Sequence, residues 1–123
     1  FSGCPCPCCP EQWVTYRGKC YSFSKEKKDW ISSQEACRAQ GAHLLVISNT
    51  SEMGFFQVPT TFHWIGLKRN TDGNWTWEDG SKLSDEKVKS NSPVQNCAVL
   101  LGGAIHASSC EVAAPWICEK SAQ

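Results

Sequence analysis

The globular part of the chain opens with two short runs in which apolar and polar side chains alternate. The runs cover residues 13–16 and 20–23, and a glycine-containing connection at residues 17–19 separates them. Two runs with a period of two residues, joined by such a short connection, predict a β-hairpin. We therefore expect the domain to begin with two antiparallel strands.

The next segment has the periodicity of an amphipathic helix. Small and apolar side chains recur three or four positions apart from Trp30 to about Gln40, which places Cys37 on the buried side. Asp29 precedes the run as a suitable N-cap, and Gly41 follows it at the position where helices often end in glycine. The pattern predicts one helix that buries a cysteine.

Most of the remaining chain is patterned as short strands. A second helix is expected from Asn49, where Glu52 completes a capping box three residues on, to Pro59, which ends it. The apolar run at residues 62–67 predicts a central strand. The other expected strands cover residues 43–47, 75–77, 97–101, 104–106 and 116–120.

Residues 82–95 are polar and aperiodic, and they contain Pro93. The pattern predicts a loop over the whole segment. A loop of this length in so small a domain is usually functional. We therefore expect this segment to take part in recognition.

The first eight residues differ in composition from the rest. Cys4, Cys6 and Cys8 stand there with prolines between them, and proline fixes φ and removes a backbone donor. Regular secondary structure is not expected in such a segment. The predicted organisation is a stalk remnant at residues 1–8, one domain at residues 9–120 and a tail at residues 121–123.

Length and charge narrow the classes of function. The chain has 123 residues, enough for a single compact core, and 12 Lys and Arg balance 12 Asp and Glu. Without a basic excess, we expect no nucleic-acid partner. No run approaches the ~18 consecutive apolar residues of a membrane helix. The sequence fits a mature secreted protein or an ectodomain whose membrane anchor precedes Phe1.

Nine cysteines in so short a chain are typical of a disulfide scaffold made in an oxidising compartment. Nine is an odd number, so at least one thiol is free or pairs with another chain. Sequons at Asn49 and Asn74 support a secretory protein, although such short patterns also arise by chance. At Asn49, glycosylation would compete with the predicted capping role. We expect an extracellular protein.

Cysteines, tryptophans and short motifs are spaced along the chain in a recognisable pattern. The positions are Cys9, Pro10, Trp13, Cys20, Tyr21, Trp30, Cys37, Leu44, Leu45, Trp64, Ile65, Gly66, Leu67, Trp77, Gly80, Cys97, Cys110, Trp116, Ile117 and Cys118. Two longer runs are Trp-Glu-Asp-Gly-Ser at 77–81 and Ala-Ser-Ser-Cys-Glu-Val at 107–112. Over residues 9–120 this pattern resembles the C-type lectin-like domain, and more narrowly the natural killer cell lectin-like receptors, including subfamily G.

The resemblance implies an α+β fold of two helices, short antiparallel β-sheets and a long loop region, stapled by disulfides. The implied pairs are Cys9–Cys20, Cys37–Cys118 and Cys97–Cys110. The three cysteines of the stalk remain outside this set. We interpret them as interchain bridges of a disulfide-linked homodimer; the alternatives are scrambled or capped thiols of a truncated stalk and a soft-metal site.

Sugar-binding members of this family hold calcium with a Glu-Pro-Asn or Gln-Pro-Asp tripeptide in the long loop and a Trp-Asn-Asp run before the third family cysteine. Here the only proline of the loop, Pro93, lies between serine and valine, and residues 105–107 are Ile-His-Ala. A calcium ion needs six to eight oxygen ligands. Asp85, Glu86 and Asn91 are better explained as solvated loop residues. We therefore expect no metal and no cofactor.

Catalytic motifs are missing from the sequence. His43, His63 and His106 are isolated among apolar or small neighbours and are expected in strands. Glu78 and Asp79 are adjacent turn residues, which more often accept hydrogen bonds from backbone amides than share a proton. The tryptophans at family core positions, expected to pack in the interior, are Trp30, Trp64, Trp77 and Trp116. We do not expect an enzyme.

Recognition remains as the function of the polar loop, because relatives dock protein ligands with this part of the domain. Lys68 and Arg69 follow the Trp64 strand and are expected near the same end. The candidate ligand-binding residues are Lys68, Arg69, Glu86, Lys87, Lys89, Asn91 and Ser92. The alternative is an ordinary solvated loop.

The leading hypothesis is the ectodomain of a type II membrane immune receptor on the extracellular side of the plasma membrane. It would bind a cell-surface protein ligand without calcium, as a disulfide-linked homodimer anchored by a membrane segment absent from this chain. The second hypothesis is a soluble, secreted, calcium-independent lectin, marked by an exposed tryptophan beside the long loop. The third is a secreted enzyme on a disulfide scaffold.

Overall fold

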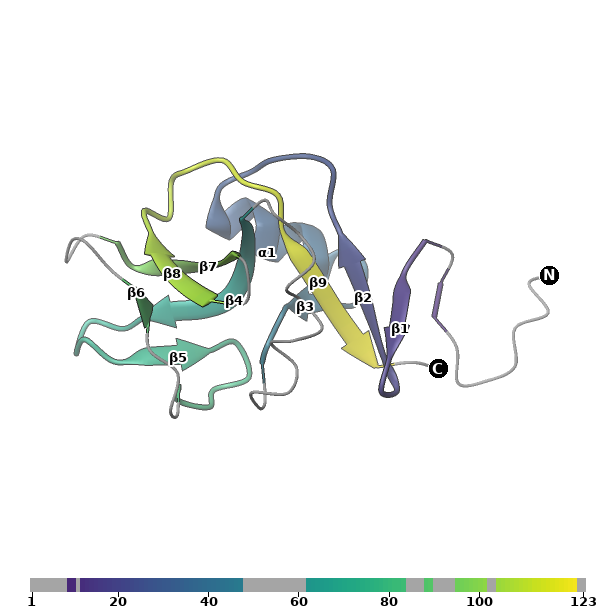
Figure 1. The fold of residues 1–123 in the computed structure, drawn as a ribbon, viewed down its shortest axis with the longest axis horizontal. Helices are drawn as coiled ribbons and strands as arrows, with labels where there is room; N and C mark the ends of the chain where they lie inside the picture. The colour runs from purple at the N-terminus through teal and green to yellow at the C-terminus, as the bar shows by residue number, and fades with distance from the viewer. Residues whose placement is uncertain are drawn as a thin grey trace.

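The structure is a computed structural model, which describes residues 9–10, 12–47, 62–83, 88–89, 95–101 and 104–121. These residues form one helix and nine strands, and the strands make two sheets. Figure 1 shows the sheets at the two ends of the domain with α1 packed beside them. This arrangement separates a four-stranded sheet from a five-stranded one.

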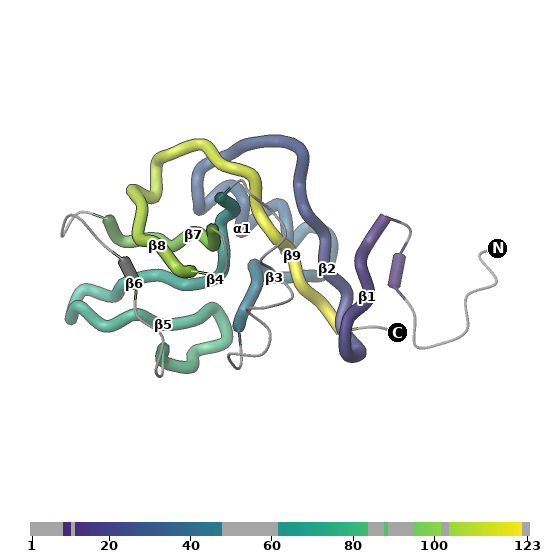
Figure 2. The backbone as a smooth tube through the Cα atoms, viewed as in Figure 1, coloured from purple at the N-terminus to yellow at the C-terminus, as the bar shows by residue number. Residues whose placement is uncertain are grey.

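The four-stranded sheet joins the first and last strands of the domain. Its strands, in spatial order, are β1 (Val14–Tyr16), β2 (Lys19–Phe23), β9 (Ile117–Ser121) and β3 (His43–Leu44). All three pairings are antiparallel. The backbone tube of Figure 2 shows β2 and β9 side by side although they lie near opposite ends of the sequence. The predicted β1–β2 hairpin is confirmed.

The five-stranded sheet carries the long-loop side of the domain. Its spatial order is β5 (Trp75–Trp77), β4 (His63–Arg69), β7 (Cys97–Leu101), β8 (Ala104–Ser108) and β6 (Val88–Lys89). The three pairings among β5, β4, β7 and β8 are antiparallel, as predicted, whereas β6 runs parallel to β8. The central position predicted for the strand after residue 62 is confirmed.

The prediction of a loop over the whole of residues 82–95 is wrong at two places. Val88 pairs with Ile105, and Lys89 pairs with His106, so part of the segment is an edge strand of the sheet. Val88 is also partly buried against the core. A strand of two residues is too short to show the alternation by which a sequence indicates a strand.

Helix α1 covers Trp30–Arg38 and begins as predicted, because the Asp29 carboxylate accepts the Ser32 N–H at 2.8 Å. It ends two residues earlier than predicted, and Gly41 has a φ of +73° in the chain reversal that follows. Cys37 is fully buried, as predicted. The second predicted helix, at residues 49–59, lies outside the described residues.

The core consists of two clusters of buried side chains. All four tryptophans predicted to be internal are at most 5% exposed. The indole N–H of Trp30 donates to the Ile65 carbonyl at 2.9 Å, and that of Trp64 donates to the Lys28 carbonyl at 2.8 Å. Each indole therefore links two segments of the chain through a satisfied polar group as well as through packing.

Three disulfides staple the described domain. They join Cys9 to Cys20, Cys37 to Cys118 and Cys97 to Cys110, which are the pairs that the family resemblance implies. The first closes the β1–β2 hairpin extension, the second ties α1 to β9, and the third ties β7 to the chain after β8. The three stalk cysteines lie outside the described residues.

Gly66 is required at the point where β4 passes the chain after β3. An added Cβ at this position would lie 2.9 Å from the Leu44 carbonyl oxygen and 3.0 Å from that of Leu45. The Gly66 N–H donates to the Leu45 carbonyl at 2.7 Å. The Trp-Ile-Gly-Leu motif thus contains a residue whose missing side chain lets two backbone segments touch.

Candidate functional site

The end of β4 places two cations over two different tryptophans. Lys68 and Arg69 lie opposite Thr76 and Trp75 of β5. The guanidinium carbon of Arg69 is 4.8 Å from the centre of the Trp75 ring, and the Lys68 ammonium is 5.4 Å from the ring of Trp30. Consecutive side chains of a strand point to opposite faces. Both cations are therefore held on aromatic surfaces while Lys68 stays exposed.

The turn between β4 and β5 is internally hydrogen-bonded. The Asn70 N–H donates to the Asn74 carbonyl at 2.7 Å, and the Gly73 N–H donates to the Asn70 carbonyl at 2.9 Å. The Asp72 carboxylate accepts the Asn74 N–H at 2.9 Å, and this hydrogen bond lowers the pKa of Asp72, with Lys82 acting in the same direction. Gly73 has a φ of +89°, which favours glycine.

Two shallow hollows flank this turn and share Gly73. One, of about 340 Å³, is lined by Arg69, Asn70, Thr71, Gly73 and Asn96. The other, of about 250 Å³, is lined by Gly73, Asn74, Trp75, Lys82 and Leu83. We call the two together the Gly73 hollows. Their walls combine amides, one aromatic ring and two cations.

Residues that follow β5 complete the second hollow by folding back along that strand. The Trp77 N–H donates to the Ser81 carbonyl at 2.8 Å, and the Leu83 N–H donates to the Trp75 carbonyl at 3.1 Å. Lys82 is exposed, and its backbone pairs with Thr76. These bonds hold the Lys82 backbone beside the hairpin that carries Arg69.

The predicted ligand-binding residues are only partly brought together. The Arg69 N–H donates to the carbonyl of Asn96, which follows the long segment directly, at 2.8 Å. Lys89, in contrast, lies on β6, and β7 and β8 separate it from β4 in the sheet order. At ~4.8 Å per strand step, the two strands are about 14 Å apart. Glu86, Lys87, Asn91 and Ser92 lie outside the described residues.

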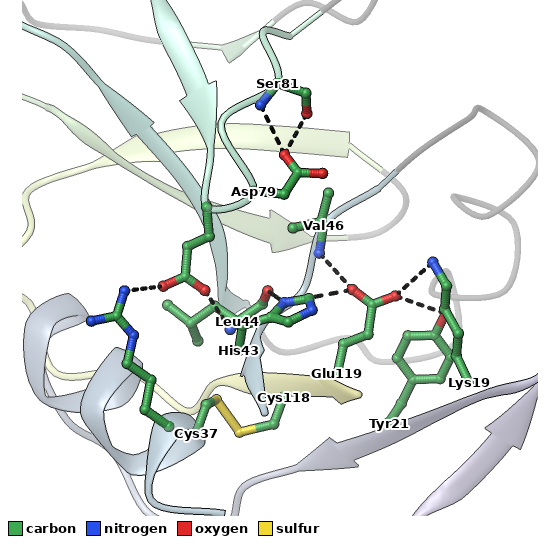
Figure 3. A network of polar contacts seen from close by, with 12 residues as sticks. Lys19, Tyr21, Cys37, His43, Leu44, Val46, Asp79, Ser81, Cys118 and Glu119 are labelled. Carbon is green, nitrogen blue, oxygen red and sulfur yellow. Dashed lines mark hydrogen bonds and ion pairs between the residues drawn. A yellow bond between two sulfur atoms is a disulfide. The ribbon is translucent and has the colours of Figure 1, made fainter. Parts of the chain in front are cut away.

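Sequence reasoning missed a buried carboxylate on the opposite sheet. Glu119 is 2% exposed. Its oxygens accept the Val46 N–H at 3.0 Å and the Tyr21 hydroxyl at 3.3 Å, and the Lys19 ammonium lies 3.2 Å away (Figure 3). The sequence contains a signal for this, because Glu119 shares one face of β9 with the buried Ile117.

Glu78, which follows β5, is a second carboxylate engaged by protein groups, with a side chain that is 7% exposed. It accepts the Leu44 N–H at 2.7 Å and the Gln34 side-chain amide at 2.5 Å, and Arg38 lies 3.7 Å from it. Its neighbour Asp79 accepts the Ser81 N–H at 2.9 Å. The prediction that this acidic pair accepts backbone amides is confirmed.

The Glu119 carboxylate accounts for the end of β3, which is shorter than predicted. The expected strand covers residues 43–47, but only His43 and Leu44 pair with β9. Beyond them the Leu45 N–H donates to the Ile117 carbonyl, whereas the Val46 N–H reaches the Glu119 carboxylate. Side-chain oxygens thus replace a strand partner for this segment.

A third hollow, of about 200 Å³, lies beside Glu119 and includes His43, Asp79 and Lys120 in its walls. Hydrogen bonds from Ser81 lower the pKa of Asp79, and the nearby His43 contributes in the same direction. The His43 Nδ1 atom is 2.7 Å from its neighbour's carbonyl and 3.9 Å from Glu119. Both oxygens of Glu119 and the Oδ1 atom of Asp79 are therefore already engaged by protein groups.

The remaining sequence expectations concern metals and catalysis. His43, His63 and His106 lie in β3, β4 and β8, so their prediction as strand residues is confirmed. Within the described ranges, no three His, Cys, Asp or Glu side chains gather as metal ligands. At the position of the calcium-binding run, Ile105 and Ala107 point into the protein and are 1% and 8% exposed.

Two sheets, a helix packed beside them and three disulfides define a C-type lectin fold. The sequence profile of the Lectin C-type domain matches residues 26–120. The chain therefore belongs to the C-type lectin domain family. This family consists of binding domains rather than enzymes, in agreement with the sequence analysis.

Solved domains of this family share the fold closely. The mouse scavenger receptor C-type lectin carbohydrate-recognition domain superposes with a TM-score of 0.84 at 29% identity, covering 94% of this chain and 98% of that domain. The cow C-type carbohydrate-recognition domain of CD23 gives 0.84 at 28% identity, covering 96% and 99%. The fold assignment therefore extends over nearly the whole chain.

Curated relatives place the chain among natural killer receptor-like domains. It is 47% identical over 123 residues to human killer cell lectin-like receptor subfamily G member 1, covering 98% of this chain and 62% of the relative. The mouse protein of that name is 44% identical, covering 94% and 61%. The pig NKG2-D type II integral membrane protein is 43% identical over 84 residues, covering 68% and 39%. The chain thus spans less than two thirds of each.

No helix in the described part of the chain is long and apolar enough to cross a membrane.

Proposed function

We propose that this chain is the ectodomain of a type II membrane immune receptor that binds a protein on another cell without calcium. The observation that carries the proposal is the cationic, hollowed surface around Gly73. In Figure 1 the β4–β5 hairpin lies at one end of the domain, and β1 and the end of β9 lie at the other. A receptor anchored through its N-terminal side would direct this surface away from its own membrane.

Charge supports a protein ligand with an acidic surface. Lys68, Arg69 and Lys82 lie on or beside the hairpin, where Asp72 is the nearby carboxylate. Among the described residues of this end, three cations therefore stand against one carboxylate. Complementary charges steer association and give specificity. The names of the relatives, a killer cell receptor and a type II integral membrane protein, support the same class.

Independence of calcium rests on the chemistry of β8. Residues 105–107 are Ile, His and Ala, so they carry no side-chain oxygen. Two of the three face the protein interior. Calcium takes six to eight oxygen ligands. Melting curves recorded with millimolar calcium and with a chelator should coincide, and a reproducible shift of several degrees would contradict this part of the proposal.

The test of the ligand class uses fluorescent tetramers of the chain on a panel of living cells. We expect staining that persists in a chelator and that disappears when the cells are treated with protease. Loss of staining after the removal of cell-surface glycans, with protease having no effect, would contradict a protein ligand.

A charge-reversal pair tests the surface itself. Lys68→Glu with Arg69→Glu should lower staining, mainly through slower association, and the loss should shrink as salt is raised because exposed charges are screened over ~10 Å at 0.1 M. The matched control is Lys25→Glu with Lys27→Glu, which reverses two exposed cations between β2 and α1. Equal losses in both pairs would refute a specific site. Reversal of Lys87 and Lys89 to glutamate is tested in the same way and should also lower staining.

The second candidate is a calcium-independent lectin, favoured by Trp75. This ring lies on a hollow beside Lys82 and Leu83 and is only partly buried. Aromatic faces support sugar rings, but Arg69 already covers part of this one. Binding of the tetramer to a glycan array, abolished by Trp75→Ala in a folded variant, would favour the lectin over the protein receptor.

We further propose the domain organisation given by the sequence, with residues 1–8 as a stalk that links two chains. Cys4, Cys6 and Cys8 cannot all pair with each other within one chain. On a non-reducing gel the protein should run largely as a dimer, and changing all three to serine should yield a folded monomer. A dimer that persists in this variant would refute the covalent link.

A further inference from the structure

The β4–β5 turn carries the sequon Asn74-Trp75-Thr76 on the rim of the Gly73 hollows. Asn74 is exposed, and its backbone is held on both sides, by Asp72 and by Asn70. The Asp72 carboxylate is hydrogen-bonded by the Asn74 side chain as well as by its backbone N–H, and both residues are exposed in the same turn. An amide that carries a glycan keeps one N–H, so attachment at Asn74 is compatible with this local contact.

The position of Asn74 relates it to both hollows. Asn74 itself lines the hollow that contains Trp75 and Lys82, and its neighbour Gly73 lines that hollow and the one that contains Arg69. An N-linked glycan is bulky and hydrophilic, and it moves about its attachment point. From this rim it would move over the shallow surface that the described lining residues form.

We propose that a glycan on Asn74 covers the Gly73 hollows, so that glycosylation of this residue regulates access to the recognition surface. The covering follows from geometry alone, whereas its consequence for ligand binding rests on the proposed function. A glycan that excludes volume without forming fixed contacts acts mainly on association, since partners must approach while it is displaced.

The covering is measured without any ligand. The chain is secreted from mammalian cells that make only high-mannose glycans. The occupancy of Asn74 is measured by enzymatic deglycosylation in water enriched in oxygen-18, which converts a glycosylated asparagine to a mass-labelled aspartate. Three forms are compared: the intact glycoprotein, the same protein trimmed to one sugar, and Asn74→Gln. Arg69 is labelled with phenylglyoxal and Trp75 with hydroxyl radicals, and each is quantified by peptide mass mapping.

We expect Arg69 and Trp75 to label about threefold more slowly in the intact form than in Asn74→Gln, with the trimmed form between them. The domain contains matched controls on the other sheet. Arg17 lies 5.2 Å from the Tyr16 ring, and Trp13 lies under Lys120 in a partly buried position. Their labelling should be the same in all three forms.

Two variants of Thr76 separate the glycan from the asparagine side chain. Thr76→Ala removes the sequon and should expose Arg69 as Asn74→Gln does. Thr76→Ser keeps both the sequon and the hydroxyl that accepts the Asn70 amide, and it should remain protected. The proposal is overturned if Asn74 is unoccupied in the secreted protein, or if Arg69 and Trp75 label equally with and without the glycan.

Cell staining distinguishes this inference from the proposed function. Asn74→Gln tetramers should stain cells more strongly than intact ones, and adding Arg69→Glu should remove the gain. If the glycan protects Arg69 from labelling but staining is the same with and without Asn74→Gln and Arg69→Glu, the glycan covers the hollows but does not regulate binding. If the glycan does not protect Arg69 from labelling but staining still falls in Arg69→Glu, the covering is refuted and the proposed recognition surface stands.

Discussion

The two sheets of this domain use charged side chains in opposite ways. In the four-stranded sheet, Glu119 is buried and accepts hydrogen bonds from a backbone amide and a tyrosine hydroxyl. In the five-stranded sheet, Lys68 and Lys82 are exposed, and Lys68 lies against an aromatic ring. A buried charge is tolerated only when it is fully engaged, whereas an exposed one contributes little to stability. The buried carboxylate of the first sheet therefore serves folding, whereas the exposed cations of the second are free to serve binding.

The largest effect is expected from removing the buried charge. Glu119→Gln leaves Lys19 and the Val46 N–H without their shared anion, and we expect a loss of about 3 kcal/mol in the free energy of unfolding, measured by denaturant titration. Glu111→Gln, an exposed glutamate after β8, is the control and should change stability by less than about 0.5 kcal/mol. Equal losses of unfolding free energy in the two variants would show that the buried carboxylate of the four-stranded sheet has no special role in stability.

The next effect concerns the place where the two sheets meet. Gly66→Ala forces a methyl group against two backbone carbonyls and should cost about 2 kcal/mol. Gly73→Ala, in open space but at positive φ, should cost about 1 kcal/mol through backbone strain alone. Thermal melts of both variants test this order, and a reversed order would show that the contact between β4 and the β3 segment is adaptable.

A smaller effect is expected on the binding side. Lys68→Glu should lower stability by only about 0.5 kcal/mol, since it removes one exposed cation–aromatic contact with Trp30. The measurement is the same denaturant titration, and the circular dichroism spectrum should not change. A loss as large as that of Glu119→Gln would mean that the five-stranded sheet also depends on its charges.

The smallest effect is a change in pH dependence at the helix start. Hydrogen bonds from Ser32, first its hydroxyl and then its backbone N–H, lower the pKa of Asp29 below 3.8. A lowered pKa stabilises the fold above that ordinary value, and the stabilisation is lost as the pH falls through the folded-state pKa. In Asp29→Asn the new side chain still caps the helix but does not titrate. The variant should melt slightly below the wild type near neutral pH and together with it in strong acid.

Much of the fold was predictable because it depends on local patterns. The hairpin at residues 13–23 follows from alternation, and α1 follows from helical spacing with a cap at Asp29. Family spacing led to the three disulfide pairs. The candidate site was predictable only at Lys68 and Arg69, which follow an apolar strand. Its hollows were not, because Gly73 and Lys82 meet only through the fold-back along β5.

The amino-acid sequence by itself determined the hairpin, the helix and most of the strands, because periodicity and caps are properties of neighbouring residues, and its resemblance to a family implied the disulfide pairs. The tertiary structure alone decided that β6 joins the sheet edge, that Glu78 holds β3 and Glu119 the chain after it, and that Asn74 borders the cationic hollows. Those features depend on which backbone N–H groups, strand edges and exposed surfaces are left unpaired once the two sheets have packed together. That outcome is set by distances in space between residues far apart in the chain.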